Sequence, residues 1–104
     1  MNISELTEKM NAFVTAKGWY DPTSPKLQTA RNLAISMSLE ASEVLEHFQW
    51  SEQDPKPTEL PGELADVALY LLQLASVTGI DLEKAILEKL ALNYSRNWSE
   101  GAQE

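Results

Sequence analysis

The sequence predicts an all-α fold, a bundle of four helices without β-strands. Apolar residues recur every three or four positions in four separate segments, which is the spacing of one helix face. Glycines and prolines separate these segments and indicate turns. We expect the 104 residues to form one domain, 1–104, in which residues 99–104 are a flexible tail. A domain this small buries little apolar surface, so we expect the bundle to be completed by oligomerisation.

The first helix is expected over about residues 3–17. Its apolar positions, in helical register, are Ile3, Leu6, Met10, Phe13 and Val14. Gly18 is a typical residue at the end of a helix. Residues 19–26 contain two prolines and several turn-forming residues, so they are expected to form a loop.

The second helix is expected over about residues 27–50 and has two apolar regions separated by a polar strip. The larger apolar stripe consists of Ala30, Leu33, Ala34, Met37, Ala41, Val44, Leu45 and Phe48. Ile35 and Leu39 lie on the other side of the helix. The polar strip between these regions contains Ser36, Glu40, Glu43 and His47. The acidic residues are therefore flanked by apolar surface on both sides.

The third helix is expected from about residue 61 or 62 to residue 78, after a proline-containing loop. Apolar residues cover nearly its whole circumference, so we expect it in the middle of the bundle, buried on most sides. Its polar residues share one narrow strip, apart from Ser76, and they are Glu59, Glu63, Asp66, Tyr70 and Gln73.

The fourth helix is expected to start after Asp81, a favourable N-cap residue, and to run to about residue 97. Gly79 ends the third helix just before it. Leu82, Ile86 and Leu90 fall in helical register along this last segment.

Charge and composition exclude several classes of function. The chain has 16 acidic and 8 basic residues and a formal net charge of −8, which argues against a nucleic-acid polymer as partner. There is no cysteine, and therefore no disulfide framework or thiolate metal site. The apolar run of residues 67–75 is interrupted by Gln73 and is short for a membrane span, so no membrane partner is expected. The first residues do not resemble a signal peptide, which predicts a cytoplasmic protein.

Two acidic pairs are the main functional signal. Glu40 and Glu43 lie three residues apart, as do Glu63 and Asp66, so each pair projects to one side of its helix. If the second and third helices pack as antiparallel neighbours, four carboxylates surround one point. Such a cluster is costly in apolar surroundings unless a cation neutralises it, whereas the alternative is an ordinary solvated face. No Lys or Arg occurs between Lys56 and Lys84, which favours the metal site.

The residue types narrow the choice of metal. A di-iron bundle requires Glu-x-x-His pairs, and the lone His47 does not stand at that spacing from Glu43 or Glu46. A zinc site requires His or Cys ligands. Oxygen ligands alone favour Mg²⁺, with Mn²⁺ as a substitute, and such ions commonly serve phosphoryl chemistry.

Two stretches of the chain resemble a known family. Residues 31–50 and 62–72 are similar to the MazG-like nucleoside triphosphate pyrophosphohydrolases, whose signature is Glu-x-x-Glu followed by Glu-x-x-Asp about twenty residues later. The Arg-Asn-Leu that begins at Arg31 and the Phe-Gln-Trp that ends at Trp50 resemble the short dCTP pyrophosphatase type. The resemblance extends over roughly residues 5–97.

This resemblance implies an all-α homodimer or homotetramer that hydrolyses a nucleoside triphosphate to the monophosphate and pyrophosphate. It implies that Glu40, Glu43, Glu63 and Asp66 bind Mg²⁺ and support catalysis. One of them, or the neighbouring Glu46, would help deprotonate the attacking water.

The resemblance also implies residues that bind the substrate. Lys89 and Asn93 match phosphate-contacting positions, and Arg96 lies near a basic position, although Asn97-Trp98 differs from the more usual Tyr-Pro. Trp19 and Trp50 match aromatic positions that hold the base. Tyr70 lies one turn after Asp66 on the polar strip, from where its hydroxyl is expected to reach the sugar or a phosphate. Their alternatives are core or interface packing for the tryptophans, a supporting role for Tyr70 and an ordinary surface lysine for Lys89. His47 is expected to be a packed or solvated residue rather than a catalyst.

Two other functions compete with a house-cleaning hydrolase of normal nucleotides. The chain could be a non-catalytic oligomeric interaction module with a structural acidic cluster. It could also act on a modified or damaged nucleotide.

Overall fold

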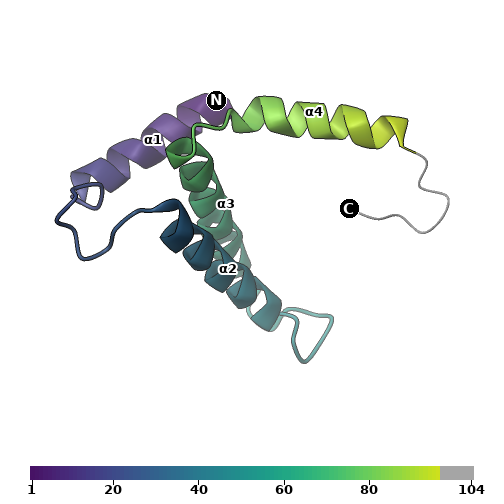
Figure 1. Ribbon diagram of the computed structural model, residues 1–104. Coiled ribbons are helices and arrows are strands. Elements are labelled where there is room, and N and C mark those ends of the chain that lie inside the picture. Colours follow the sequence, from purple (N-terminus) through teal and green to yellow (C-terminus); the bar gives the residue numbers. More distant parts are fainter. Residues whose placement is uncertain (97–104) are drawn as a thin grey trace.

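A computed structural model describes residues 1–96, and these form four α-helices and no strand. The helices are α1 (Ile3–Ala16), α2 (Ala30–Glu46), α3 (Leu60–Val77) and α4 (Leu82–Ser95) (Figure 1). The all-α class and the number of helices are confirmed. The expected tail of residues 99–104 lies outside the described residues.

Capping residues set the helix boundaries. The side chain of Asn2 accepts a hydrogen bond from the Glu5 backbone N–H at 2.8 Å, and the Glu5 side chain accepts one from Asn2 at 2.9 Å. Gly18 and Gly79 follow α1 and α3 with φ angles of 75° and 73°, a left-handed conformation that glycine adopts without strain.

Helix α2 is shorter than expected at both ends. It begins only at Ala30 because Thr29 is its N-cap, with a side chain that accepts a hydrogen bond from the Asn32 backbone N–H at 3.1 Å. It ends at Glu46 because the backbone closes turns at His47 and Phe48. The apolar residues that extended the prediction to Leu27 and beyond Glu46 therefore lie in loops.

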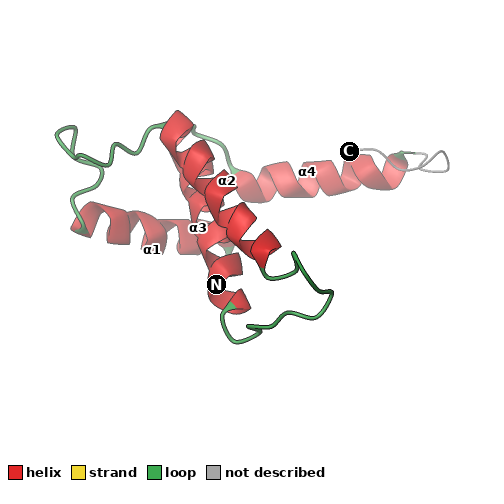
Figure 2. Ribbon diagram, turned by 90° about the horizontal axis from the view of Figure 1, so that it is seen from below, coloured by secondary structure: helices red, strands yellow, loops and turns green. Residues whose placement is uncertain are grey.

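Helices α2 and α3 form an antiparallel pair that is the centre of the fold, and Figures 1 and 2 show them side by side. Leu33 of α2 is the largest fully buried side chain, with 2 % of its surface exposed. Helix α1 crosses the far end of α3, where Met10, Val14 and Leu72 form a buried apolar cluster. The hydrogen bond from Asn11 Nδ2 to Ser76 Oγ, 3.0 Å long, joins the same two helices.

Helix α4 extends away from the α2–α3 pair (Figure 1). It touches α1 only near its start, and none of its residues is buried. One chain by itself therefore does not close a four-helix bundle.

The expectation that α3 is buried on most sides is wrong for the single chain. Only Leu72, Gln73 and Ala75 of this helix are buried, whereas Leu64 is 51 % exposed. The reason is that α1 and α2 cover only part of its apolar circumference.

Helix α3 is also long and apolar enough to cross a membrane, with 18 residues of mean hydropathy 1.2. This apolar stretch is longer than the run of residues 67–75 considered from the sequence. Length and composition alone are weak grounds for a membrane span, because a core helix can have the same character. Helix α3 also carries Glu63 and Asp66, which are costly in a bilayer.

Candidate functional site

Three carboxylates converge where α2 and α3 pack together. Glu40 and Glu43 come from consecutive turns of α2, and Glu63 comes from the first turns of α3. One oxygen from each of the three lies within 4.8 Å of the others, close enough to hold a single metal ion. This geometry agrees with the expectation that the two polar strips face each other.

Asp66, the fourth predicted acid, lies beside this group. It is not one of the three carboxylates that approach one another within 4.8 Å, but its negative charge acts on Glu40. The four acids thus share one electrostatic environment.

Ionising all the carboxylates of the cluster is unfavourable, because their negative charges lie close together. The pKa of Glu40 is raised to about 7, first by its hydrogen bond with Glu43 and then by desolvation. The negative charges of Glu43, Asp66 and Glu63 raise this pKa further. A cation among these groups would reverse the effect, because it favours the ionised carboxylates.

Two carboxylate oxygens in the cluster are buried and have no hydrogen-bond partner. They are Oε2 of Glu40 and Oε2 of Glu63. Buried polar atoms are normally satisfied, and hard divalent cations prefer carboxylate oxygens as ligands. The residues present therefore fit a divalent metal ion.

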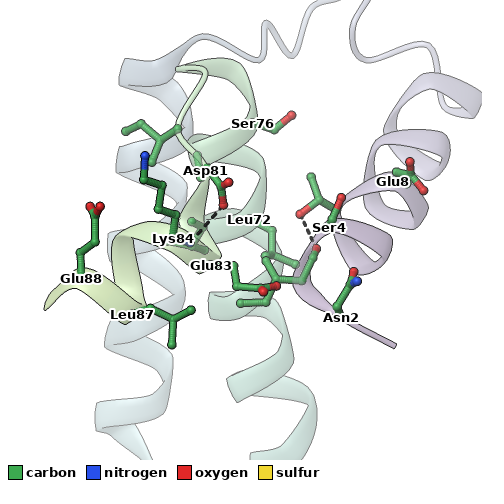
Figure 3. A pocket seen from close by; sticks show the side chains of 15 residues that line it. Asn2, Ser4, Glu8, Leu72, Ser76, Asp81, Glu83, Lys84, Leu87 and Glu88 are labelled. Carbon is green, nitrogen blue, oxygen red and sulfur yellow. Dashed lines mark hydrogen bonds between the residues drawn. The ribbon is translucent and has the colours of Figure 1, made fainter. Parts of the chain in front are cut away.

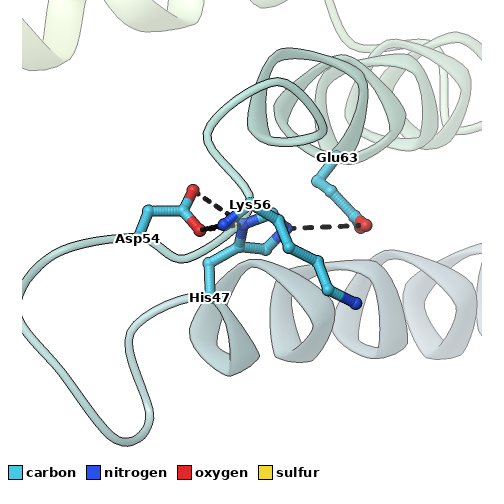
Figure 4. Close-up of polar contacts among 4 residues, drawn as sticks. All are labelled: His47, Asp54, Lys56 and Glu63. Atoms are coloured by element: carbon cyan, nitrogen blue, oxygen red, sulfur yellow. Dashed lines mark hydrogen bonds and ion pairs between the residues drawn. The ribbon is translucent and has the colours of Figure 1, made fainter.

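His47 is the most unexpected member of the site. It is the C-cap residue of α2 and is buried, which confirms a packed histidine. Its Nδ1 lies 2.7 and 2.8 Å from the two carboxylate oxygens of Asp54, and its Nε2 lies 3.7 Å from Glu63 Oε1 (Figure 4). The hydrogen bond with Asp54 is the main cause that raises the pKa of His47, partly offset by desolvation, and the charges of Asp54 and Glu63 raise it further.

Sequence reasoning placed His47 on the polar strip but did not identify Asp54. Asp54 belongs to the loop between α2 and α3, where no periodic pattern predicts which way a side chain points. The only available signal was an acid seven residues after a histidine on the acidic strip.

A cavity of about 530 Å³ begins at the acids and runs between α1 and α3. Its volume is in the range of small-molecule sites. Glu40, Asp66 and Tyr70 line one part of it, and Trp19 lines another. Further polar side chains in its wall are Lys9, Lys26, Gln28 and Gln73.

Neighbouring side chains fix the aromatic and amide groups of this wall. Trp19 packs edge-on against Phe13, with ring centroids 5.6 Å apart, and Lys26 Nζ lies 5.1 Å from the Trp19 ring centroid. Gln73 is buried and donates a hydrogen bond from Nε2 to Gln28 Oε1 at 2.6 Å. The cavity thus joins an acidic part to an aromatic part.

Four other predicted substrate residues do not line this cavity in the single chain. Trp50 lies in the α2–α3 loop and is 89 % exposed. Lys89 and Asn93 belong to α4, and Arg96 is its C-cap residue, so all three follow that helix away from the α2–α3 pair.

A second cavity, of about 560 Å³, lies where the first turns of α1 and α4 meet the end of α3 (Figure 3). Asp81 and Lys84 lie at the start of α4 on its wall, opposite Ser4 and Glu8 of α1. None of the site residues predicted from the sequence lines this second cavity.

Comparisons with known proteins extend these observations. The chain is similar to dCTP pyrophosphatase 1 of Rattus norvegicus, with 36 % identity over 75 residues, which are 64 % of this chain and 44 % of the relative. It is also 33 % identical over 81 residues to a dATP/dGTP diphosphohydrolase of Salmonella phage PMBT28, covering 78 % of this chain and 24 % of the relative. The chain therefore spans less than half the length of these curated relatives.

A solved structure is similar along most of both chains. It is a pyrophosphatase from Archaeoglobus fulgidus, with a TM-score of 0.69, 34 % sequence identity and coverage of 86 % of each chain. The model of the MazG-like family matches residues 35–103, which include both acidic pairs. The resemblance inferred from the sequence is confirmed, and the chain belongs to the MazG-like family.

Proposed function

We propose that the protein hydrolyses a nucleoside or deoxynucleoside triphosphate to the monophosphate and pyrophosphate. One observation carries this proposal: Glu40 belongs both to the group of three carboxylates and to the wall of the cavity that Trp19 lines. A triphosphate held near the acids could therefore extend its base toward an aromatic ring. The relatives are named as a pyrophosphatase and a diphosphohydrolase, which agrees with this reaction.

The metal of the proposed enzyme is Mg²⁺, with Mn²⁺ as a substitute. Glu40, Glu43, Glu63 and Asp66 would hold it, and the two buried oxygens without partners support this assignment. When bound, the cation would neutralise triphosphate charge and increase the acidity of water.

The acids of the chain would act on the nucleophile. Water attacks the α-phosphorus, and the bond from this phosphorus to the oxygen that bridges to the β-phosphorus breaks. The bond electrons leave with pyrophosphate, and a carboxylate of the cluster accepts a proton from the attacking water. The group of acids is thus proposed to serve both as metal ligand and as catalytic base.

The remaining site residues are proposed to bind the substrate. Trp19 would stack on the base, and Tyr70, one turn after Asp66, would reach the sugar or a phosphate. Trp50 is proposed as a second base contact. Stacking on aromatic rings accepts any base, so the rings alone do not select one nucleotide.

The phosphate contacts are proposed to come from α4, through Lys89, Asn93 and Arg96. Because α4 extends away from the acids of its own chain, these residues would meet an active site only in an oligomer.

We also propose that the protein is a homo-oligomer, a dimer or a dimer of dimers. The exposed apolar side chains of α4 support this, since Leu87, Leu90 and Leu92 lack cover in one chain. The role proposed for the enzyme is house-cleaning of the nucleotide pool in the cytoplasm, on a normal or modified base.

A nucleotide panel tests the proposed activity. The protein is incubated with Mg²⁺ and each nucleotide, including oxidised and methylated ones, and released pyrophosphate is measured. We expect Glu43→Gln and Asp66→Asn to abolish hydrolysis while circular dichroism shows intact helices, whereas Glu52→Gln, at an exposed loop position, keeps full activity.

The same experiment distinguishes the competing function. Absence of turnover with every nucleotide, together with no stabilisation by Mg²⁺, would favour an oligomeric interaction module whose acids are structural. Full activity of either acidic variant would refute the assigned site.

A further inference from the structure

The single histidine of the chain lies between two carboxylates from different parts of the fold (Figure 4). Its Nδ1 faces both oxygens of Asp54, and its Nε2 faces Oε1 of Glu63. The side chains of His47 and Asp54 are only 6 % and 8 % exposed, and that of Glu63 is 21 % exposed. The three residues therefore form a continuous row from the loop to helix α3.

Asp54 is held by its own loop as well as by the histidine. Its Oδ1 accepts a hydrogen bond from the Lys56 backbone N–H at 2.8 Å, two residues later. The carboxylate thus has a fixed position from which it orients the imidazole. With Nδ1 directed at Asp54, Nε2 is directed across to α3.

Stability alone is a poor reason for this arrangement. A buried ion pair costs desolvation, and well-packed apolar side chains in its place are often equally stable or more stable. Of the three residues in the row, Glu63 alone belongs to the acidic cluster, so the row is better explained by an effect on the position of the Glu63 carboxylate.

The two oxygens of Glu63 have different surroundings. Oε1 faces His47 at 3.7 Å, whereas Oε2 is buried and has no hydrogen-bond partner. One side of the carboxylate therefore faces the imidazole, and the other is available to the group formed with Glu40 and Glu43.

We propose that His47 and Asp54 are positioning residues that hold Glu63 so that its Oε2 is presented to the divalent cation. This rests on the proposed function, because it assumes that the three carboxylates hold a metal. A glutamate side chain has several rotatable bonds, so fixing one oxygen in advance reduces the ordering that metal binding requires. Partners that orient a metal ligand typically contribute about 10–100-fold to metal affinity.

Metal binding can be measured without nucleotide turnover. Mn²⁺ affinity is measured by electron paramagnetic resonance, and Mg²⁺ affinity by competition with Mn²⁺. We expect His47→Gln and Asp54→Asn to weaken binding about 10–100-fold. Asp21→Asn is a matched control, because Asp21 also accepts a backbone hydrogen bond two residues later, from Thr23, and makes no contact with a histidine. It should bind metal like the wild type.

A positioning role also predicts dependence on Glu63. In a Glu63→Gln background, replacing Asp54 should cause no further loss of Mn²⁺ affinity. The lone histidine gives one set of ring signals in nuclear magnetic resonance, and Mg²⁺ should shift these signals in the wild type but not in Glu63→Gln.

Unchanged Mn²⁺ affinity in Asp54→Asn, even with a lower melting temperature, would show a merely structural role and overturn the proposal. Because Asp54→Asn keeps the histidine, this result does not depend on whether His47→Gln folds. If the wild type binds Mn²⁺ more tightly than His47→Gln and Asp54→Asn but hydrolyses no nucleotide, the proposed function is refuted and the positioning role is supported. A wild type that binds no divalent cation would overturn both.

Discussion

Replacing Glu40 with glutamine is expected to remove a pH-dependent loss of stability from the metal-free protein. The pKa of Glu40 is raised from 4.5 to about 7 in the folded chain, so the folded protein binds this proton more tightly than the unfolded chain does. Stability therefore falls as the pH rises through this window. Glutamine has no proton to lose and should not show this part of the fall.

The size of the effect follows from the pKa difference of about 2.5 pH units between 4.5 and about 7. At 1.36 kcal/mol per pH unit, the upper limit is about 3.4 kcal/mol. Water reaches part of the Glu40 side chain and screens these charges, which reduces the expected loss to about 1–2 kcal/mol. For a domain of this size, that corresponds to a fall in Tm of about 5–10 °C.

The assay is thermal unfolding followed by circular dichroism, from pH 4.5 to pH 7, in the presence of a chelator. The wild type and Glu40→Gln are compared at each pH, because titratable groups outside the acidic cluster contribute equally to both. His47 is one such group, since its raised pKa adds stability that is lost as the pH rises above 6.5. Saturating Mg²⁺ should restore the Tm of the wild type at neutral pH, because the cation stabilises the ionised cluster.

Parallel pH profiles for the wild type and Glu40→Gln would refute this reasoning. They would mean that the carboxylates of the cluster do not interact in the folded protein as their positions indicate.

Three further outcomes are expected. Leu33→Ala removes the most buried large side chain and should cost about 2–5 kcal/mol in urea unfolding, whereas the exposed control Gln49→Ala should change stability by less than about 0.5 kcal/mol. Asp81→Ala removes the side chain that accepts the Lys84 backbone N–H at 3.1 Å and should cost about 0.5–2 kcal/mol, measured in the same way. Trp19→Ala should raise KM by about 5–150-fold, from a stacking contribution of about 1–3 kcal/mol, and Trp19→Phe should recover most of it. An unchanged KM in Trp19→Ala would remove this residue from base binding.

The helices and the acidic group were predictable because their signals are local. Apolar spacing along one segment defines a helix face, and acids three residues apart share a side whatever the rest of the chain does. Both ends of α2 were less predictable, because the cap at Thr29 and the turn at Phe48 override the continued apolar pattern.

The cavity wall was only partly predictable. Trp19 and Tyr70 were expected near the substrate and do line it. Gln28 was not expected, because it lies in a loop and meets Gln73 of α3 only after the chain has reversed direction. Contacts of this kind depend on packing between elements far apart in the sequence.

By itself, the sequence determined four helices, two acidic pairs that each share one side of a helix, and membership of a family. Each of these follows from the spacing of residues along the chain, which does not depend on how the chain folds. Only the tertiary structure decided that the loop residue Asp54 reaches His47, that one oxygen of Glu63 faces His47, and that α4 extends away from the acids of its own chain. These features depend on where the loops direct their side chains and on which apolar helix faces pack against another helix. Neither can be read from the spacing of apolar residues within one segment.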